Sequence, residues 1–249
     1  RPSNTPADAP VSEVVDALDL TEAAEAGTQE KPTVVNDADE LKAAVEAGGY
    51  IKLNANITAS IEIKNEVHLD LNGKTLTNEA GKPTITVANG GSLTVDGSGT
   101  VDNVSHAKPA VLNQQGGTVV LSGGSYTRSK EDSKENSFYN LQNLGTMTIN
   151  SGVSVTADGH YSSLVANGWY NGSQNTAKQE ANLTITGGNF SGGLNTIKND
   201  DWGVLKISGG NFSNTTQATV INWNKTTVTG GTFESKADVF ANGYKSADS

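Results

Sequence analysis

The sequence predicts an all-β solenoid, a stack of short strands wound coil upon coil, and two observations carry this prediction. The phrase LTITGGNFSG, from Leu183 to Gly192, returns as LKISGGNFSN, from Leu205 to Asn214, 22 residues further along the chain. A second pattern, an apolar residue followed two positions later by Asn, also recurs in one register. Most coils of this length are too short to hold a strand plus a long crossover helix, so stacked strands explain the repeats best.

The composition agrees with a fold rich in turns and limits the function. The chain of 249 residues has 28 Gly but only 5 Phe and 3 Trp, which argues against a conventional thick globular core. The 17 Lys and Arg against 27 Asp and Glu give a net charge of −10, so we expect no nucleic-acid partner. The chain has no Cys, which excludes disulfides and thiol chemistry, and no apolar run long enough for membrane insertion.

The first 49 residues precede the repeats. Residues 1–33 form an acidic stretch rich in Pro and Ala, which we interpret as an arm or linker. Residues 34–49 predict a short amphipathic helix, because Asp37 stands three residues before Glu40, as at a helix N-cap, and Gly48 provides a stop. We assign residues 50–249 to the solenoid.

One strand motif, two apolar residues separated by one position, repeats along the solenoid. Its copies are Leu93/Val95, Val119/Leu121, Met147/Ile149, Leu183/Ile185, Leu205/Ile207 and the weaker Thr226/Val228. Most copies are followed by a Gly-Gly pair and then by an aromatic residue, namely Tyr126, Phe190, Phe212 or Phe233. Glycine supplies the positive-φ bend, and we expect the aromatic ring to fill the corner beyond it.

The second motif places Asn at a bend between two strands of one coil. Its copies are Val87/Asn89, Val111/Asn113, Leu141/Asn143, Val165/Asn167, Ile197/Asn199 and Val220/Asn222. Hydrogen-bonded strands stack about 4.8 Å apart, so side-chain amides in one register fall above one another and can bond along the stack. The sequence therefore predicts an asparagine ladder formed by Asn89, Asn113, Asn143, Asn167, Asn199 and Asn222.

These features together resemble the right-handed parallel β-helix of the pectate-lyase-like superfamily. The resemblance covers about residues 50–235 and rests on VHLDLNGKTL at residues 67–76, the repeated strand with its Gly-Gly bend, and the Asn motif. It implies a right-handed parallel β-helix of about eight rungs. The helix within residues 34–49 would then stand where this family caps its first coil, hiding an edge that otherwise pairs with other chains.

Many members of this superfamily cleave acidic polysaccharides, so the resemblance raises the question of catalysis. A polygalacturonase-like site implies an Asp pair, which Asp200 and Asp201 supply, but His160 lacks the flanking second Gly and no Arg-x-Lys occurs. A lyase-like site implies Ca²⁺-binding acids with an Arg or Lys base, and the only arginines are Arg1 and Arg128. Adjacent acids in a turn are more often a solvated corner. We therefore expect no catalytic residue, no metal and no cofactor.

A binding surface is expected near the C-terminal end of the stack. All three tryptophans follow a ladder Asn within one to three residues, so their rings are predicted to line one edge of the solenoid. The predicted binding residues are Trp169, Tyr170, Asp200, Asp201, Trp202 and Trp223. Exposed aromatic rings at repeat spacing can stack on sugars or anchor a protein partner. Packing of the rings against the insertion at residues 167–182 is an equally good alternative.

The expected function is a non-catalytic recognition or adhesion module, extracellular and displayed on a bacterial cell surface, with a glycan or a protein as its ligand. The first alternative is a phage virion component, such as a fibre, tailspike-like or head-decoration protein, docked by residues 1–33. The second alternative is a polysaccharide lyase or hydrolase that uses Asp200 and Asp201. Outward Ser and Thr suit solvent or a polar lateral contact equally, so a homotrimer stays open.

Overall fold

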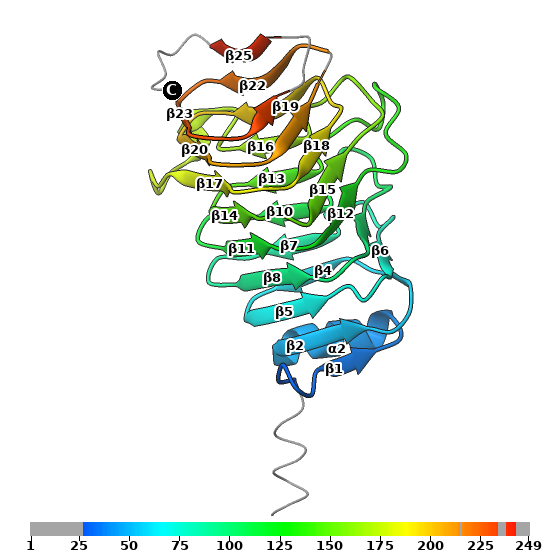
Figure 1. Cartoon of the computed structure of the whole chain (residues 1–249). Helices are drawn as coiled ribbons and strands as arrows, with labels where there is room; N and C mark the ends of the chain where they lie inside the picture. Colours follow the sequence, from blue (N-terminus) through cyan, green and yellow to red (C-terminus); the bar gives the residue numbers. More distant parts are fainter. Residues whose placement is uncertain (1–26, 215, 234–237, 243–249) are drawn as a thin grey trace, which may run out of the picture.

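The computed structural model describes residues 27–214, 216–233 and 238–242, and it is a parallel β-helix (Figure 1). Its strands form three sheets of nine, eight and eight strands, and every paired strand in them is parallel. The predicted all-β solenoid of about eight rungs is confirmed. Most of the predicted arm, residues 1–26, lies outside the described residues.

The chain visits the three sheets in turn, so that from β2 onward each strand pairs with the strand three further along. Sheet 1 contains β1 (Thr33–Val35), β2 (Gly49–Leu53), β5 (Glu66–Asp70), β8 (Ser92–Asp96), β11 (Thr118–Leu121), β14 (Thr146–Ile149), β17 (Ala181–Ile185), β20 (Gly203–Ile207) and β23 (Lys225–Val228). Sheet 2 contains β3 (Ile57–Thr58), β6 (Thr75–Thr77), β9 (Thr100–Asp102), β12 (Gly124–Thr127), β15 (Val153–Thr156), β18 (Asn189–Ser191), β21 (Asn211–Ser213) and β24 (Thr232–Phe233). Sheet 3 contains β4 (Ile61–Ile63), β7 (Ile85–Val87), β10 (Val111–Asn113), β13 (Leu141–Asn143), β16 (Val165–Asn167), β19 (Asn195–Asn199), β22 (Ala218–Asn222) and β25 (Asp238–Asn242).

The helix α2 (Ala38–Ala47) lies at the N-terminal end of the stack (Figure 1). Asp37 is its N-cap, and the Asp37 side chain accepts a hydrogen bond from the backbone N–H of Glu40, as the sequence predicts. The helix ends at Gly48, whose φ of 81° is the left-handed conformation that glycine adopts most easily. Leu41, Ala44 and Val45 on one face of α2 are buried, and the helix contacts β1, β2 and β4, so it covers the first rungs.

The repeated strand motif forms the inner face of sheet 1. Leu93, Val119, Met147, Leu183 and Leu205 stand opposite one another on consecutive strands, and all are buried. Side chains alternate across a strand, so the intervening residues point outward. Every second residue of these strands is therefore buried, as the sequence pattern predicts for a solenoid with a narrow apolar core.

The aromatic residues Tyr126, Phe190 and Phe212, which follow the glycine bends, are buried within strands of sheet 2, and not in the corner where the sequence analysis expected them. Gly210 has a φ of 109°, and the next strand places Phe212 in the core. The ring of Phe212 stacks on Phe190 at a centroid distance of 4.8 Å and on Phe233 at 5.0 Å. Stacked identical rings arise because each rung repeats the conformation of the one below it.

An asparagine ladder runs up the corner between sheets 3 and 1. Each amide Nδ2 donates to the Oδ1 of the next Asn: Asn113 to Asn143 at 2.9 Å, Asn143 to Asn167 at 2.8 Å, Asn167 to Asn199 at 2.9 Å and Asn199 to Asn222 at 2.9 Å. All five are buried. The backbone register continues from Asn222 to Asn242.

The assignment of Asn89 to the ladder is wrong. Asn113 pairs with Val87, and Asn89 lies two residues further on, exposed in the turn. The prediction matched the pattern of apolar residue, any residue and Asn at Val87/Asn89, but Val87 itself holds the ladder position. Six residues separate Val87 from Leu93, as six separate Asn113 from Val119. Sheet 3 therefore has an apolar corner in its lower rungs.

Candidate functional site

The three tryptophans do not form the single row that the sequence predicts. Trp169 is 8% exposed and its backbone pairs with Asp201, with N–H···O distances of 3.0 and 3.2 Å. Trp202 and Trp223 are half-buried and line different hollows. Tyr170 is the exposed ring of the group, at 82%. Part of the predicted aromatic edge is thus packed and part faces solvent.

One hollow brings together most of the predicted binding residues. It measures about 340 Å³ and is lined by Tyr170, Asn171, Lys198, Asp200, Asp201 and Trp223, and we call it the Tyr170–Trp223 pocket. Its walls come from the insertion after β16, from the end of β19 with the turn that follows, and from the turn after β22. These segments are far apart in sequence but adjacent in the stack, because β16, β19 and β22 are consecutive strands of sheet 3.

Lys198 lies at the centre of this pocket, on the outer face of β19. Its Nζ lies 3.8 Å from Asp200 Oδ2 and 4.9 Å from the centroid of the Tyr170 ring. The side chains of Lys198 and Asp200 are only 21% and 7% exposed, so water screens this pair less than a surface pair. The ammonium group therefore makes a cation–π contact with the tyrosine ring and an ion pair with the carboxylate.

The insertion that carries Tyr170 is fastened to the rung above. Asp201 Oδ2 accepts a hydrogen bond of 2.9 Å from the backbone N–H of Gly172. Gly172 begins the short 3₁₀ helix η1 (Gly172–Gln174), which Asn171 caps by accepting from the N–H of Ser173. Predicted binding residue Asp201 thus holds the wall of the pocket.

Tyr139, which the sequence analysis missed, also reaches this group. It lies in the loop between β12 and β13, and burial raises its pKa most, with further increases from the charge of Asp200 and from Tyr170. The charge of Lys198 and a hydrogen bond with Lys198 act in the opposite direction. The phenol is therefore protonated at neutral pH and can take part in hydrogen bonds. No local pattern marks Tyr139, because only the stacking of coils brings its loop near β19.

The residues considered for catalysis have structural partners. Asp200 pairs with Lys198, and Asp201 accepts from Gly172. Arg128 is buried, its guanidinium donates to the backbone oxygens of Ser105 and Asn136, and burial lowers its pKa. Within the described ranges no group of three His, Asp or Glu side chains is arranged to hold a metal ion. The expected lack of catalysis stays a prediction.

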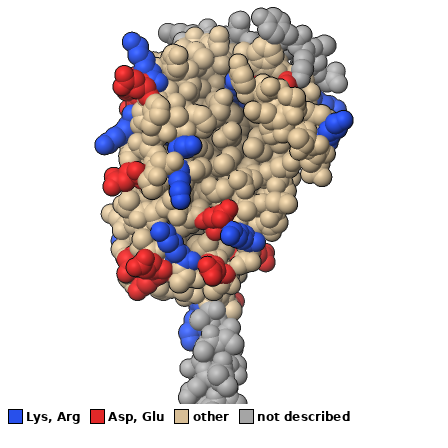
Figure 2. Space-filling view, turned by 180° about the vertical axis from the view of Figure 1, so that it is seen from behind, with Lys and Arg blue, Asp and Glu red and all other residues tan. Residues whose placement is uncertain are grey.

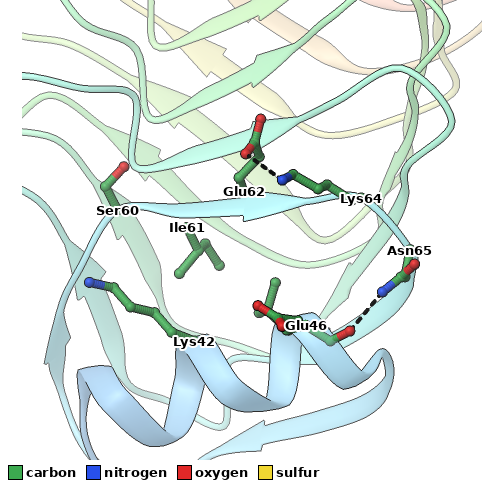
Figure 3. Close-up of a pocket in the computed structure, with 8 residues that line it drawn as sticks. Lys42, Glu46, Ser60, Ile61, Glu62, Lys64 and Asn65 are labelled. Atoms are coloured by element: carbon green, nitrogen blue, oxygen red, sulfur yellow. Dashed lines mark hydrogen bonds and ion pairs between the residues drawn. The ribbon is translucent and has the colours of Figure 1, made fainter.

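A further hollow lies at the opposite end of the stack, between α2 and β4 (Figure 3). It measures about 520 Å³, and its lining contains no aromatic residue. Glu62 pairs with Lys64 at 3.5 Å, and Asn65 Nδ2 donates to the backbone oxygen of Glu46 at 2.7 Å. Lys42 extends from the helix along the same opening (Figure 3). Its charged, exposed lining gives a ligand no ring to pack on.

The Tyr170–Trp223 pocket lies at the outer face of sheet 3, and the hollow beside α2 lies at the N-terminal edge of the same sheet. Charged side chains gather at the N-terminal end and at the edges of this face, and most of the surface between them is uncharged (Figure 2).

A comparison with protein-family models, curated proteins and solved structures found no match for the chain. In the part of the chain that the structure describes, no helix has the length and apolar character needed to cross a membrane.

Proposed function

We propose that this protein is a non-catalytic recognition module that binds a glycan in the Tyr170–Trp223 pocket. The observation that carries the proposal is an exposed ring in contact with a half-buried charge: Tyr170 is 82% exposed, and the Nζ of Lys198 lies 4.9 Å from its centroid. A ring that is ordered before binding loses little conformational freedom when a ligand stacks on it. A sugar offers both the apolar face that stacks and the hydroxyl groups that bond.

The chemistry of the pocket suits a glycan at three points. Trp223 supplies a second apolar surface, and Asn171 supplies an amide that donates and accepts. Lys198, on β19, supplies a donor, and Asp200, in the turn that follows, supplies an acceptor. Aromatic rings with a few fixed polar groups are typical of pockets for small polar ligands.

The resemblance to the pectate-lyase-like superfamily also supports a glycan ligand, and we propose that the module acts outside a bacterial cell, on its surface. A lyase or hydrolase is less well supported, because Asp200 and Asp201 serve the pocket's own structure. A protein ligand, as in a virion component, would use the same rings as anchors. Both alternatives are outcomes of the experiment below.

The test is a binding titration against soluble bacterial, plant and mucin glycans, with released reducing ends measured in the same samples. We expect saturable binding that falls at least tenfold in Tyr170→Ala, about 1.4 kcal/mol or more. Tyr161→Ala is the matched control, because Tyr161 is also exposed, at 63%, but lies outside the pocket. Released ends that disappear in an Asp200→Asn, Asp201→Asn double variant would establish the enzyme instead. Absence of binding to every glycan would overturn the proposal and favour a protein partner.

A further inference from the structure

Trp202 has a backbone conformation that a bulky residue rarely adopts. Its φ is 64°, in the left-handed region where a bulky residue is a rare outlier and glycine is the usual choice. The turn uses only the backbone of this residue, because the Trp202 carbonyl accepts the N–H of Ala181 at 3.0 Å. A glycine would make the same bond without strain. Strain that persists at one residue is a reason to ask what its side chain does.

The indole of Trp202 lines a hollow of about 570 Å³, which we call the Trp202 pocket. The other residues that line it include Gln115, Lys178, Gln179, Glu180 and Asn182. It shares no lining residue with the Tyr170–Trp223 pocket. The insertion after β16 separates the two, since Tyr170 and Asn171 line one hollow and residues 178–180 line the other.

The wall of the Trp202 pocket is fixed by a chain of hydrogen bonds. Gln115 Nε2, from the turn after β10, donates to Asn175 Oδ1 at 2.8 Å. The buried Asn175 in turn donates from Nδ2 to the backbone oxygen of Gln179 at 2.7 Å. The insertion is thereby tied to a rung two coils below it, and the pocket exists before any ligand arrives.

The lining favours an uncharged ligand with many hydroxyl groups. Gln115, Gln179 and Asn182 are among the lining residues, and each has a side-chain amide that can donate and accept hydrogen bonds. The charges of Lys178 and Glu180 cancel, and the chain as a whole carries −10, which repels polyanions. The indole offers a flat apolar surface on which one face of a sugar ring can stack.

We propose that the Trp202 pocket is a second glycan-binding site, specific for a pyranose unit of a neutral glycan. It goes beyond the function proposed above, because it depends on none of the residues of the Tyr170–Trp223 pocket. With both sites occupied, the module would hold one glycan surface at two points, which raises its apparent affinity without new contacts.

The test follows the indole N–H signals of the three tryptophans by NMR while neutral hexasaccharides are added at millimolar concentration. The probes are cellohexaose, mannohexaose and hexa-N-acetylchitohexaose, with hexagalacturonate as the anionic counterpart, and Trp202→Phe assigns the signal. We expect a saturable shift of the Trp202 signal with a neutral probe, retained in Tyr170→Ala. A Trp202 signal that is unmoved by every neutral probe, or moved only by hexagalacturonate, would overturn the proposal. A shift confined to Trp223 would overturn it while leaving the function proposed above intact.

Two variants separate a binding role of Trp202 from a packing role. Trp202→Gly removes both the indole and the left-handed strain, so we expect at least tenfold weaker binding with an unchanged or higher melting temperature. A lower melting temperature with unchanged binding would show that the indole only packs, and would overturn the proposal. Gln179→Ala leaves the backbone oxygen that Asn175 uses, and should weaken binding of the neutral probe severalfold at constant stability.

Discussion

The lower and upper rungs of the solenoid fill the same corner with different chemistry. Where sheet 3 turns into sheet 1, the lower rungs place Ile63 and Val87, and from Asn113 upward the same position holds the asparagine ladder. The core column of sheet 2 changes in parallel, from Leu76 in a lower rung to Phe212 in an upper one. One backbone fold is thus stabilised by aliphatic packing below and by amide bonds and stacked rings above.

The comparison teaches why both pockets lie among the upper rungs. The side-chain amide of a ladder Asn donates a hydrogen bond to a backbone oxygen at or near the start of the next strand. It does so whether the turn between them is short or long. Asn143 Nδ2 donates to Gly145 at 3.2 Å across a short turn, and Asn167 Nδ2 donates to Ala181 at 3.0 Å across the long insertion. The ladder therefore restores the strand register after an insertion. An apolar corner has no group that can do so.

The largest effect is expected from breaking the ladder with Asn167→Leu. Asn167 accepts from Asn143 and donates to Asn199 and Ala181, so the change removes buried hydrogen bonds that join three rungs and takes the Asn167 donor from Asn199 Oδ1. We expect the free energy of unfolding to fall by at least about 3 kcal/mol, measured by urea denaturation. Ile63→Val is the matched control at the apolar corner and should cost about 0.5 to 1.5 kcal/mol. Equal losses in the two variants would contradict the role given to the ladder.

A smaller effect is expected from extending the ladder downward with Val87→Asn. Among the described residues, Asn113 Oδ1 is buried without a hydrogen-bond partner, because no Asn stands below it. An amide at position 87 would donate to that oxygen, and Gly91 leaves room in the turn as Gly117 does one rung above. We expect Val87→Asn to cost at least about 1 kcal/mol less than Ile63→Asn, which has Val87 above it. Thermal or urea denaturation of both variants measures the difference, and a larger cost at position 87 would refute it.

The smallest and most gradual effect on the free energy of unfolding is expected at alkaline pH, from Tyr126, which lies in the core column of sheet 2. Tyr126 is fully buried and its hydroxyl donates to the Gly123 oxygen at 2.8 Å. Burial, and then the charge of Asp96, raises its pKa far above the usual value. Above about pH 10 the unfolded tyrosine releases its proton and the folded one does not, so stability falls by about 1.4 kcal/mol per pH unit for this residue. Denaturation at several alkaline pH values should show a shallower fall in Tyr126→Phe, and Tyr161→Phe, an exposed control, should keep the original slope.

Much of the fold was predictable because it is periodic. A strand alternates its side chains, so a residue pair such as Leu183 and Ile185 fixes which face is buried, and the recurrence of that pair fixes the stack. The ladder positions from Asn113 to Asn222 follow from the same recurrence. Asn89 was assigned wrongly because the pattern of an apolar residue, any residue and Asn occurs by chance at the start of a turn. Turn lengths differ from rung to rung, so the sequence pattern alone does not reveal the error.

The candidate site was predictable only in part. The sequence indicates that residues 167–223 carry aromatic rings beside acids, and the Tyr170–Trp223 pocket contains four of the six predicted residues, Tyr170, Asp200, Asp201 and Trp223. It does not indicate that Trp169 is buried or that Trp202 lines another hollow. These directions depend on how the insertion folds across the rungs, which no repeat governs.

The sequence by itself determined the rung: a strand, a glycine bend with its aromatic residue, and an amide at the corner, each set by short-range spacing. Only the tertiary structure decided what lies between rungs. It brought Tyr139 to Lys198 and tied Gln115 to Asn175, contacts that join coils distant in sequence. The physical reason is that neighbours within a strand are fixed by backbone geometry, whereas neighbours across the stack depend on the lengths of all the turns between them.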